Sequence, residues 1–139
     1  MKKNIIRSVV MGLVILGLIE CVASDLSKYT EINSFSVSKQ LSAVKQNYNA
    51  IKFISNPNKA VQLAAVKQSY HAIRLIKNPT KEVQLAAVKQ NFEAIKFIEN
   101  PDKEVQLAAV KQSYFAIRLI KNPTKEALQL SYIKIREEN

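Results

Sequence analysis

The chain has 139 residues, a formal net charge of +10 and 47% hydrophobic residues, with two glycines and no tryptophan. This composition is too apolar for a disordered chain and too poor in glycine for a typical β-sandwich or β-barrel. The excess of Lys and Arg favours acidic partners such as nucleic acid, anionic lipid, anionic glycan or an acidic protein, and it also keeps a small protein soluble.

The first 24 residues have the three-part organisation of a secretory signal peptide. A basic start at residues 2–7 is followed by an uncharged, mostly apolar run at 9–19, and the small residues Ala23 and Ser24 precede Asp25. The apolar run is too short for a normal membrane span. We therefore expect cleavage after Ser24 or Ala23 and export to the periplasm or the medium. The alternative is an uncleaved leader that anchors the protein in a membrane.

Cys21 is the only cysteine, so the chain has no internal disulfide. It stands where a bacterial lipoprotein carries its lipid-modified cysteine, which offers a second route to a membrane anchor. Lipoprotein signals place a small residue directly before that cysteine, whereas this chain has Glu20. We therefore favour plain cleavage, by which Cys21 leaves with the leader.

From Gln40 the chain repeats with a period of 22 residues, and alternate units are the most similar. A fixed period of this length is typical of a solenoid, in which each unit buries its apolar face against its neighbours. We predict an all-α fold, a solenoid of short helical repeats with a degenerate N-terminal cap and a C-terminal capping helix. The expected cap, four full units and capping helix occupy residues 25–39, 40–61, 62–83, 84–105, 106–127 and 128–139.

Asn-Pro pairs mark the ends of helices, because the residue before proline is disfavoured in helical conformation. Residues suited to N-caps follow each pair, and acidic residues fall in the next turn, where the helix dipole favours them. The expected caps are Thr80, Asp102, Thr124 and the weaker Asn58, and the first-turn acids are Glu82, Glu104 and Glu126.

Each unit forms either one long helix or two short helices, such as 104–112 and 114–121. As one helix, the unit places the polar residues Gln106 and Ser113 within its apolar arc. A break at Ser113 removes this conflict and lets each short helix direct its own face to the core. We therefore favour two short helices, with equivalent breaks at Asn47, Ser69 and Asn91.

The phrase NPTKEVQLAAVKQ, followed by an aromatic residue and AIRLIKNP, resembles a family of short helical repeats in bacterial and phage proteins, catalogued as a domain of unknown function. It is more distantly similar to HEAT-type and leucine-rich-variant repeats. The resemblance covers residues 40–127. It implies a helical superhelix that serves as a binding scaffold, and it supplies no catalytic residues.

We expect no enzymatic activity, cofactor or metal. His71 is the only histidine, and its counterparts in the other units are different residues. One Cys and one His cannot form a zinc cluster, and both glycines lie in the leader, so there is no glycine-rich phosphate loop.

Two basic sets recur at the repeat spacing. They could bind an anionic polymer or membrane, although a solvated, solubilising surface is the interpretation that we favour. The candidate residues for polyanion binding are Lys45, Lys67, Lys89 and Lys111 in one set and Lys52, Arg74, Lys96 and Arg118 in the other.

Aromatic residues recur at Tyr48, Tyr70, Phe92 and Tyr114, where we expect core positions rather than base-stacking platforms. Two further positions vary among units whose other residues stay the same, as a surface that reads a partner would. These candidate partner-binding residues are Asn49, His71, Glu93 and Phe115, directly after the aromatic residue, and Ser55, Lys77, Glu99 and Lys121, before Asn-Pro.

The sequence thus predicts an exported interaction scaffold whose partner is another protein. The alternative is an envelope-associated basic protein that binds anionic lipid, glycan or nucleic acid.

The leader prediction is tested by the intact mass of the protein in each fraction of a bacterial host. We expect a soluble exported species that begins at Asp25. A heavier membrane-bound species, with an uncut leader or with lipid at Cys21, would contradict plain cleavage.

Overall fold

The computed structural model describes residues 31–138, which are all-helical apart from their turns. Short α-helices alternate with six-residue 3-10 helices, labelled η. The elements are η2 (Ile32–Ser34), α3 (Val37–Gln46), η3 (Tyr48–Phe53), α4 (Lys59–Gln68), η4 (Tyr70–Leu75), α5 (Lys81–Gln90), η5 (Phe92–Phe97), α6 (Lys103–Gln112), η6 (Tyr114–Leu119) and α7 (Lys125–Glu137). The predicted leader and Cys21 lie outside the described residues.

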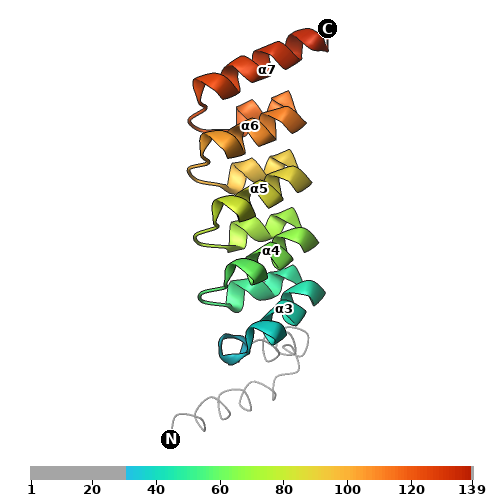
Figure 1. Ribbon diagram of the computed structural model, residues 1–139, viewed down its shortest axis with the longest axis vertical. Helices are drawn as coiled ribbons and strands as arrows, with labels where there is room; N and C mark the ends of the chain where they lie inside the picture. Colours follow the sequence, from blue (N-terminus) through green and yellow to red (C-terminus); the bar gives the residue numbers. More distant parts are fainter. Residues whose placement is uncertain (1–30, 139) are drawn as a thin grey trace, which may run out of the picture.

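Successive units stack into one elongated array, with η2 at one end and α7 at the other (Figure 1). Each α-helix packs against the α-helices before and after it, and each η-helix packs against its neighbouring η-helices. The array therefore has an α-helix side and a 3-10 side. The predicted all-α repeat architecture is confirmed.

The break predicted within each unit is present. Ser69, Asn91 and their counterparts have extended backbone, with φ between −150° and −156°, which ends the α-helix after its Gln. The Asn91 side chain then starts the next helix, since its Oδ1 accepts a 2.8 Å hydrogen bond from the Glu93 N–H. Asn47 and Ser69 form the same contact.

The second helix of each unit differs from the prediction, since it is a 3-10 helix and in the last full unit ends at Leu119 rather than residue 121. The physical reason is the period of the pattern FEAIKFIE, in which apolar residues recur every third position. A 3-10 helix has three residues per turn, so Phe92 and Ile95 share one side, and Ile98 follows at the extended C-cap. Ile95 is 1% exposed and Ile98 7% exposed.

Gln106 is the polar residue that a single long helix would place within its apolar arc. In the structure its side chain forms hydrogen bonds with the turns on either side of its unit. Its side chain is 4% exposed. Its Nε2 donates to the carbonyls of Pro101 (2.9 Å) and Asn122 (3.3 Å), and its Oε1 accepts from the Thr124 N–H at 2.8 Å. Gln62 and Gln84 likewise donate to the proline carbonyls of their own turns. These bonds satisfy turn groups that burial removes from water.

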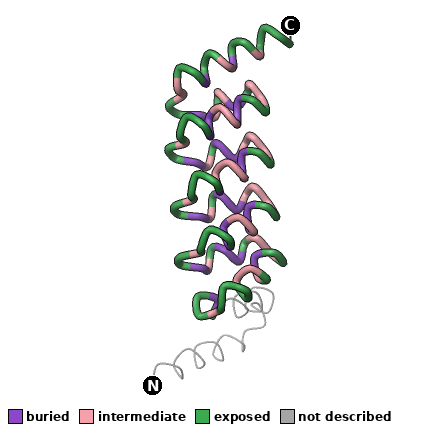
Figure 2. The backbone as a smooth tube through the Cα atoms, in the orientation of Figure 1, coloured by how far each residue is buried: buried purple, intermediate pink, exposed green. Residues whose placement is uncertain are grey.

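The core consists of the same side chains repeated in every unit, and Figure 2 shows buried positions at the same place in successive layers. Three sets of equivalent buried residues extend along the array. They are the valines Val44, Val66, Val88 and Val110, the valines Val61, Val83 and Val105, and the isoleucines Ile51, Ile73 and Ile95, all 1% exposed or less.

The N-terminal end, where a degenerate cap was expected, has contacts that follow the repeat. Ile32 is fully buried, and Oδ1 of Asn33 accepts a 2.7 Å hydrogen bond from the N–H of Ser55, one unit further on. Ser36 is the N-cap of α3, as Asn58 is of α4. Helix α3 therefore begins within the expected cap, and the structural unit starts three residues before Gln40.

The C-terminal helix α7 starts at Lys125 rather than at residue 128, and it keeps the 22-residue spacing. Leu128 thus occupies the position of Gln106. Gln106 bonds to the turn that follows its unit, but no such turn follows α7 in the described chain. Leu128 therefore has no turn to contact, and it is 48% exposed. Tyr132 is 62% exposed, so this capping helix presents an aromatic ring to solvent.

We predict that Gln106→Ala lowers the free energy of unfolding by about 2–3 kcal/mol, because it leaves the Thr124 N–H and the Pro101 carbonyl without their partner in a buried place. Urea denaturation measures the change. Gln129→Ala is the control, since Gln129 is exposed, and we expect a change within about 0.5 kcal/mol. Equal effects of the two substitutions would contradict this role of Gln106.

Candidate protein-binding surface

The outer surface of the α-helix side is built from one ten-residue phrase, KEVQLAAVKQ in α5 and α6. In α5, Val83, Ala87 and Val88 are fully buried. At 100° per residue, Leu85 and Lys89 point away from that buried set. Leu85 is half-buried and Lys89 is exposed. Helices α3 to α6 therefore each present a half-buried leucine and an exposed lysine on this side.

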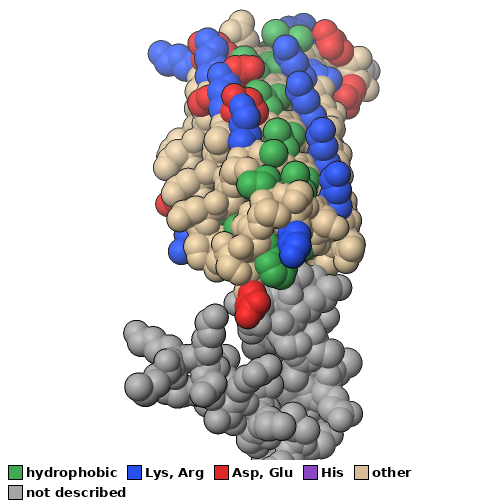
Figure 3. All heavy atoms as spheres, turned by 60° about the horizontal axis from the view of Figure 1, so that its bottom comes forward, with side chains coloured by type: hydrophobic (Ala, Val, Ile, Leu, Met, Phe, Trp, Pro, Cys, Tyr) green, Lys and Arg blue, Asp and Glu red, His purple; other side chains and the backbone are tan. Residues whose placement is uncertain are grey.

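Because the units stack, the leucine and the lysine each form a row along the array, and the charged residues at the start of the α-helices form a third row parallel to them. Figure 3 shows a column of hydrophobic side chains between two columns of Lys and Arg, one of which is interleaved with acidic side chains. The leucine stripe consists of Leu41, Leu63, Leu85 and Leu107, all half-buried. The lysine row consists of Lys45, Lys67, Lys89 and Lys111, all exposed. The paired-charge row consists of Lys59, Lys81, Lys103 and Lys125 with Glu82, Asp102, Glu104 and Glu126.

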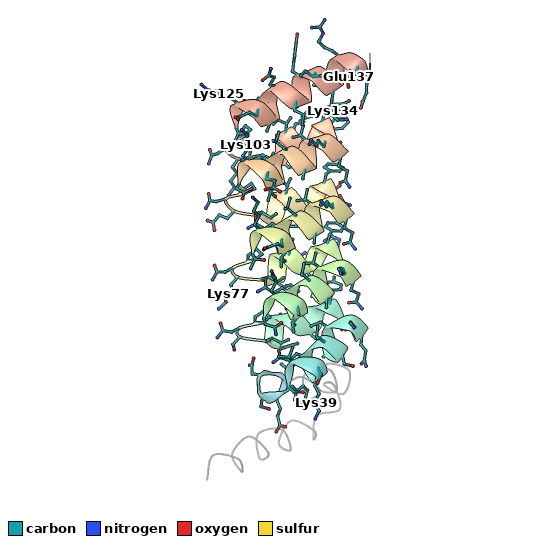
Figure 4. The ribbon with its side chains drawn as sticks, viewed as in Figure 1. Lys39, Lys77, Lys103, Lys125, Lys134 and Glu137 are labelled. Atoms are coloured by element: carbon teal, nitrogen blue, oxygen red, sulfur yellow. The ribbon has the colours of Figure 1, made fainter. Side chains whose placement is uncertain are left out.

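The paired-charge row is neutralised from within. Lys103 Nζ lies 2.6 Å from Glu126 Oε1 in the next unit, and Lys59 Nζ lies 3.6 Å from Glu82 Oε1. Lys81 contacts Glu104 in the same way. The row holds four lysines and four acids, so it carries no net charge. The pairing is uneven, since Lys81 contacts both Asp102 and Glu104, whereas Lys125 forms no ion pair within residues 31–138. Figure 4 places Lys103 and Lys125 at the edge where the turns lie.

These ion pairs shift several pKa values. The hydrogen bond from Lys103 lowers the pKa of Glu126, and the hydrogen bond to Glu104 raises the pKa of Lys81. The pKa of Glu82 is lowered chiefly by its own backbone N–H and then by the Thr80 hydroxyl. All four predicted caps lie at N-cap positions, but only Asn58, Asp102 and Thr124 accept a hydrogen bond from the backbone N–H three residues on, and Thr80 does not.

The lysine row differs from the paired-charge row. Within residues 31–138, no side chain of the lysine row forms an ion pair or lies over an aromatic ring. The backbone beneath them is well fixed, since Nε2 of Gln90 donates to the carbonyl of Lys67 at 3.0 Å and Gln112 does the same to Lys89. The row is therefore a rigidly spaced series of cations with free ammonium groups.

A shallow depression opens on this same side between α5 and α6. It is lined by Lys81, Asp102, Lys103, Glu104 and Leu107. Leu107 belongs to the leucine stripe, and the charged groups belong to the paired-charge row. A partner side chain seated there would contact an apolar floor within a neutral charged rim.

The other predicted residues lie on the 3-10 side. Residues three apart share a face of a 3-10 helix. The structure therefore brings together two predicted sets, the variable residues Asn49, His71, Glu93 and Phe115 and the basic residues Lys52, Arg74, Lys96 and Arg118. The second variable set lies in the turns that follow, and all four of its residues are exposed, as Figure 4 shows for Lys77. These residues are Ser55, Lys77, Glu99 and Lys121. The two predicted basic sets are therefore on opposite sides of the array and do not form one cationic surface.

Several groups on the 3-10 side are occupied by contacts within the chain. Lys96 Nζ lies 2.8 Å from Glu93 Oε2 and 5.1 Å from the ring centre of Phe97. Arg74 also lies over Phe97, at 5.8 Å. The His71 ring is half-buried, with its centre 4.0 Å from that of Tyr70. These contacts leave the basic groups of this side less free than the lysine row.

Asn49 and Phe115, the other two variable residues that directly follow an aromatic residue, are more exposed than His71 and Glu93. Asn49 is exposed, and the Phe115 ring is 50% exposed and stacks on Tyr114 at 4.3 Å. Of the four recurring aromatic residues predicted at core positions, Tyr48, Tyr70 and Phe92 are half-buried and pack against the core, whereas Tyr114 is half-buried without being part of that cluster.

Within residues 31–138 there is no group of three or more His, Cys, Asp or Glu side chains placed to hold a metal ion. None of the described helices is both long and apolar enough to span a membrane. The chain matches no protein-family model, and no curated protein or solved structure is significantly similar to it.

Sequence reasoning did not single out the leucine stripe. Each leucine lies in a run of apolar residues, so the pattern alone does not distinguish a half-exposed leucine from a core residue. The identical Leu in every unit, next to the recurring Lys four residues on, was the available signal.

We predict a pH dependence from the paired-charge row. The folded pKa of Glu126 is below its ordinary value of 4.5, so its stabilisation is complete above that value and is lost as the pH falls through the folded pKa. The Tm of Glu126→Gln should therefore fall less than that of the unmodified protein between pH 6 and pH 3.

Thermal unfolding followed by circular dichroism measures this difference. Glu99→Gln is the matched control, since Glu99 is exposed in a turn and forms no ion pair in the described part of the chain. Parallel Tm profiles for Glu126→Gln and the unmodified protein would show that the Lys103–Glu126 pair does not stabilise the fold.

Proposed function

We propose that this protein is a non-enzymatic scaffold that binds another protein along the α-helix side of its solenoid. The observation that carries the proposal is the leucine stripe beside a row of lysines without partners. Apolar contact area next to free charge is the composition of protein interfaces, in which the apolar part supplies affinity and the charges supply specificity.

A surface specialised for polyanions would gather its cations on one side. Here the two basic sets lie on opposite sides, and a neutral row borders the leucine stripe. The lysine row by itself supports the second candidate, an anionic lipid, glycan or nucleic acid at the cell envelope. If the leader is cleaved as predicted, the partner lies outside the cytoplasm.

Photo-crosslinking in the cells that make the protein tests the proposal. A benzophenone amino acid replaces Lys67 or Lys89 on the α-helix side, and Lys77 or Glu99 in the turns as matched controls. We expect a discrete protein adduct from the first pair and none from the second. Lipid or nucleic-acid adducts, or protein adducts from the turn positions alone, would overturn the proposal.

The double substitution Lys89→Glu with Lys111→Glu should abolish the adduct formed from a benzophenone at Lys67. Both lysines are exposed and outside ion pairs, so the helical circular dichroism and the Tm should stay within a few degrees of the unmodified protein. Arg74→Glu with Lys96→Glu is the control for added negative charge. An adduct that survives the first pair of substitutions would show that the lysine row is not part of the interface.

Binding of the purified protein to a 20-nucleotide single strand and to vesicles containing anionic lipid, measured from 50 to 200 mM salt, tests the second candidate. Polyanion binding falls steeply with salt because it releases counterions. We expect only weak binding at 150 mM salt. Tight, steeply salt-dependent binding that Lys89→Glu with Lys111→Glu abolishes would favour the second candidate.

A further inference from the structure

We infer that the segment bound on the α-helix side is an acidic amphipathic α-helix that lies along the array, across α3 to α6, with acidic residues every seventh position. This inference rests on the proposed function and names the class of partner. It follows from the spacing of the lysine row, the position of the leucine stripe and the neutrality of the row on its other flank.

The spacing comes from the packing of the α-helices. Each α-helix packs directly on the next, and packed helices lie about 9 Å apart. One lysine of the row therefore follows another at about that interval. In an α-helix that runs along the array, residues seven apart lie on one face about 10.5 Å from each other. A flexible lysine side chain accommodates the difference over three intervals.

Other backbones match this spacing less well. Residues on one face of an extended strand recur about every 6.7 Å, so acids would meet lysines irregularly along the row. A lipid surface has no fixed spacing at all. A helical partner is the arrangement in which every repeat of the scaffold makes the same contact with the ligand.

The rows specify the faces of that helix. Its apolar face would cover the leucine stripe, and the acidic positions on one flank would meet Lys45, Lys67, Lys89 and Lys111. Its other flank would meet the paired-charge row, which carries no net charge and so favours neither sign. The four lysines span about 27 Å, and four acids placed at every seventh position span about 31.5 Å, which needs a helix of about 22 residues.

The experiment uses two stapled helical peptides of about 24 residues with the same composition, net charge and apolar face. One carries Glu every seventh residue on the flank of the apolar face, and the other carries the same Glu residues on the opposite face. Fluorescence anisotropy with the purified protein at 150 mM salt compares their affinities. We expect the first peptide to bind at least tenfold more tightly.

A matched pair of variants locates the effect. Replacing Lys45, Lys67, Lys89 and Lys111 by Gln should remove the tenfold difference between the peptides. Replacing Lys52, Arg74, Lys96 and Arg118 by Gln removes the same charge from the 3-10 side and should leave the difference in place.

Equal binding of the two peptides, or binding of neither, would overturn the inference. If protein adducts still form at Lys67 and Lys89 in cells, the proposed function stands and only the acidic helix is wrong. If no protein adduct forms there, the proposed function itself fails.

Discussion

The architecture depends on the hydrogen bond that the glutamine at the start of a repeat donates to the proline carbonyl of the turn before it, as Gln62, Gln84 and Gln106 do. A unit of 22 residues must turn back twice, and the Asn-Pro turn exposes carbonyl and amide groups beside an apolar core. In the last full unit the side chain of Gln106 satisfies groups in the turn before it and in the turn after it. Because one amide reaches both turns, it also sets where the next α-helix begins, at its cap Thr124.

The α-helix and the 3-10 helix of a unit contribute different residues to the core and to the surface. The α-helix buries valine and alanine on one side and offers Leu and Lys on the other, while the 3-10 helix buries Ile and an aromatic residue every third position. The extended residue between them, for example Asn91, turns the chain from one side of the array to the other. Equivalent units then stack, so any outward residue repeated in the sequence becomes a row on the surface.

The rows differ in what they leave available to a partner. Along the turn edge, lysines and acids of successive units neutralise one another, and on the 3-10 side rings and Glu93 contact the basic groups. Within residues 31–138 the lysine row has no such contacts, and both this row and the leucine stripe are regular from α3 to α6. The proposed binding surface therefore combines lysines whose ammonium groups are free with half-buried leucines, of which Leu41, Leu63 and Leu85 also pack against the core.

The sequence by itself determined the period, the all-α class, the break within each unit and the helix caps, because these depend on local preferences of Asn-Pro, Ser, Asn and Thr. It did not reveal the 3-10 helix, whose three-residue period was present in FEAIKFIE but resembles an ordinary amphipathic pattern over so few residues. It also placed both basic sets together as candidate polyanion sites. Only the tertiary structure decided that the sets face opposite ways and that Leu85 is half-exposed, because both follow from how neighbouring units pack, which the sequence of a single unit does not encode.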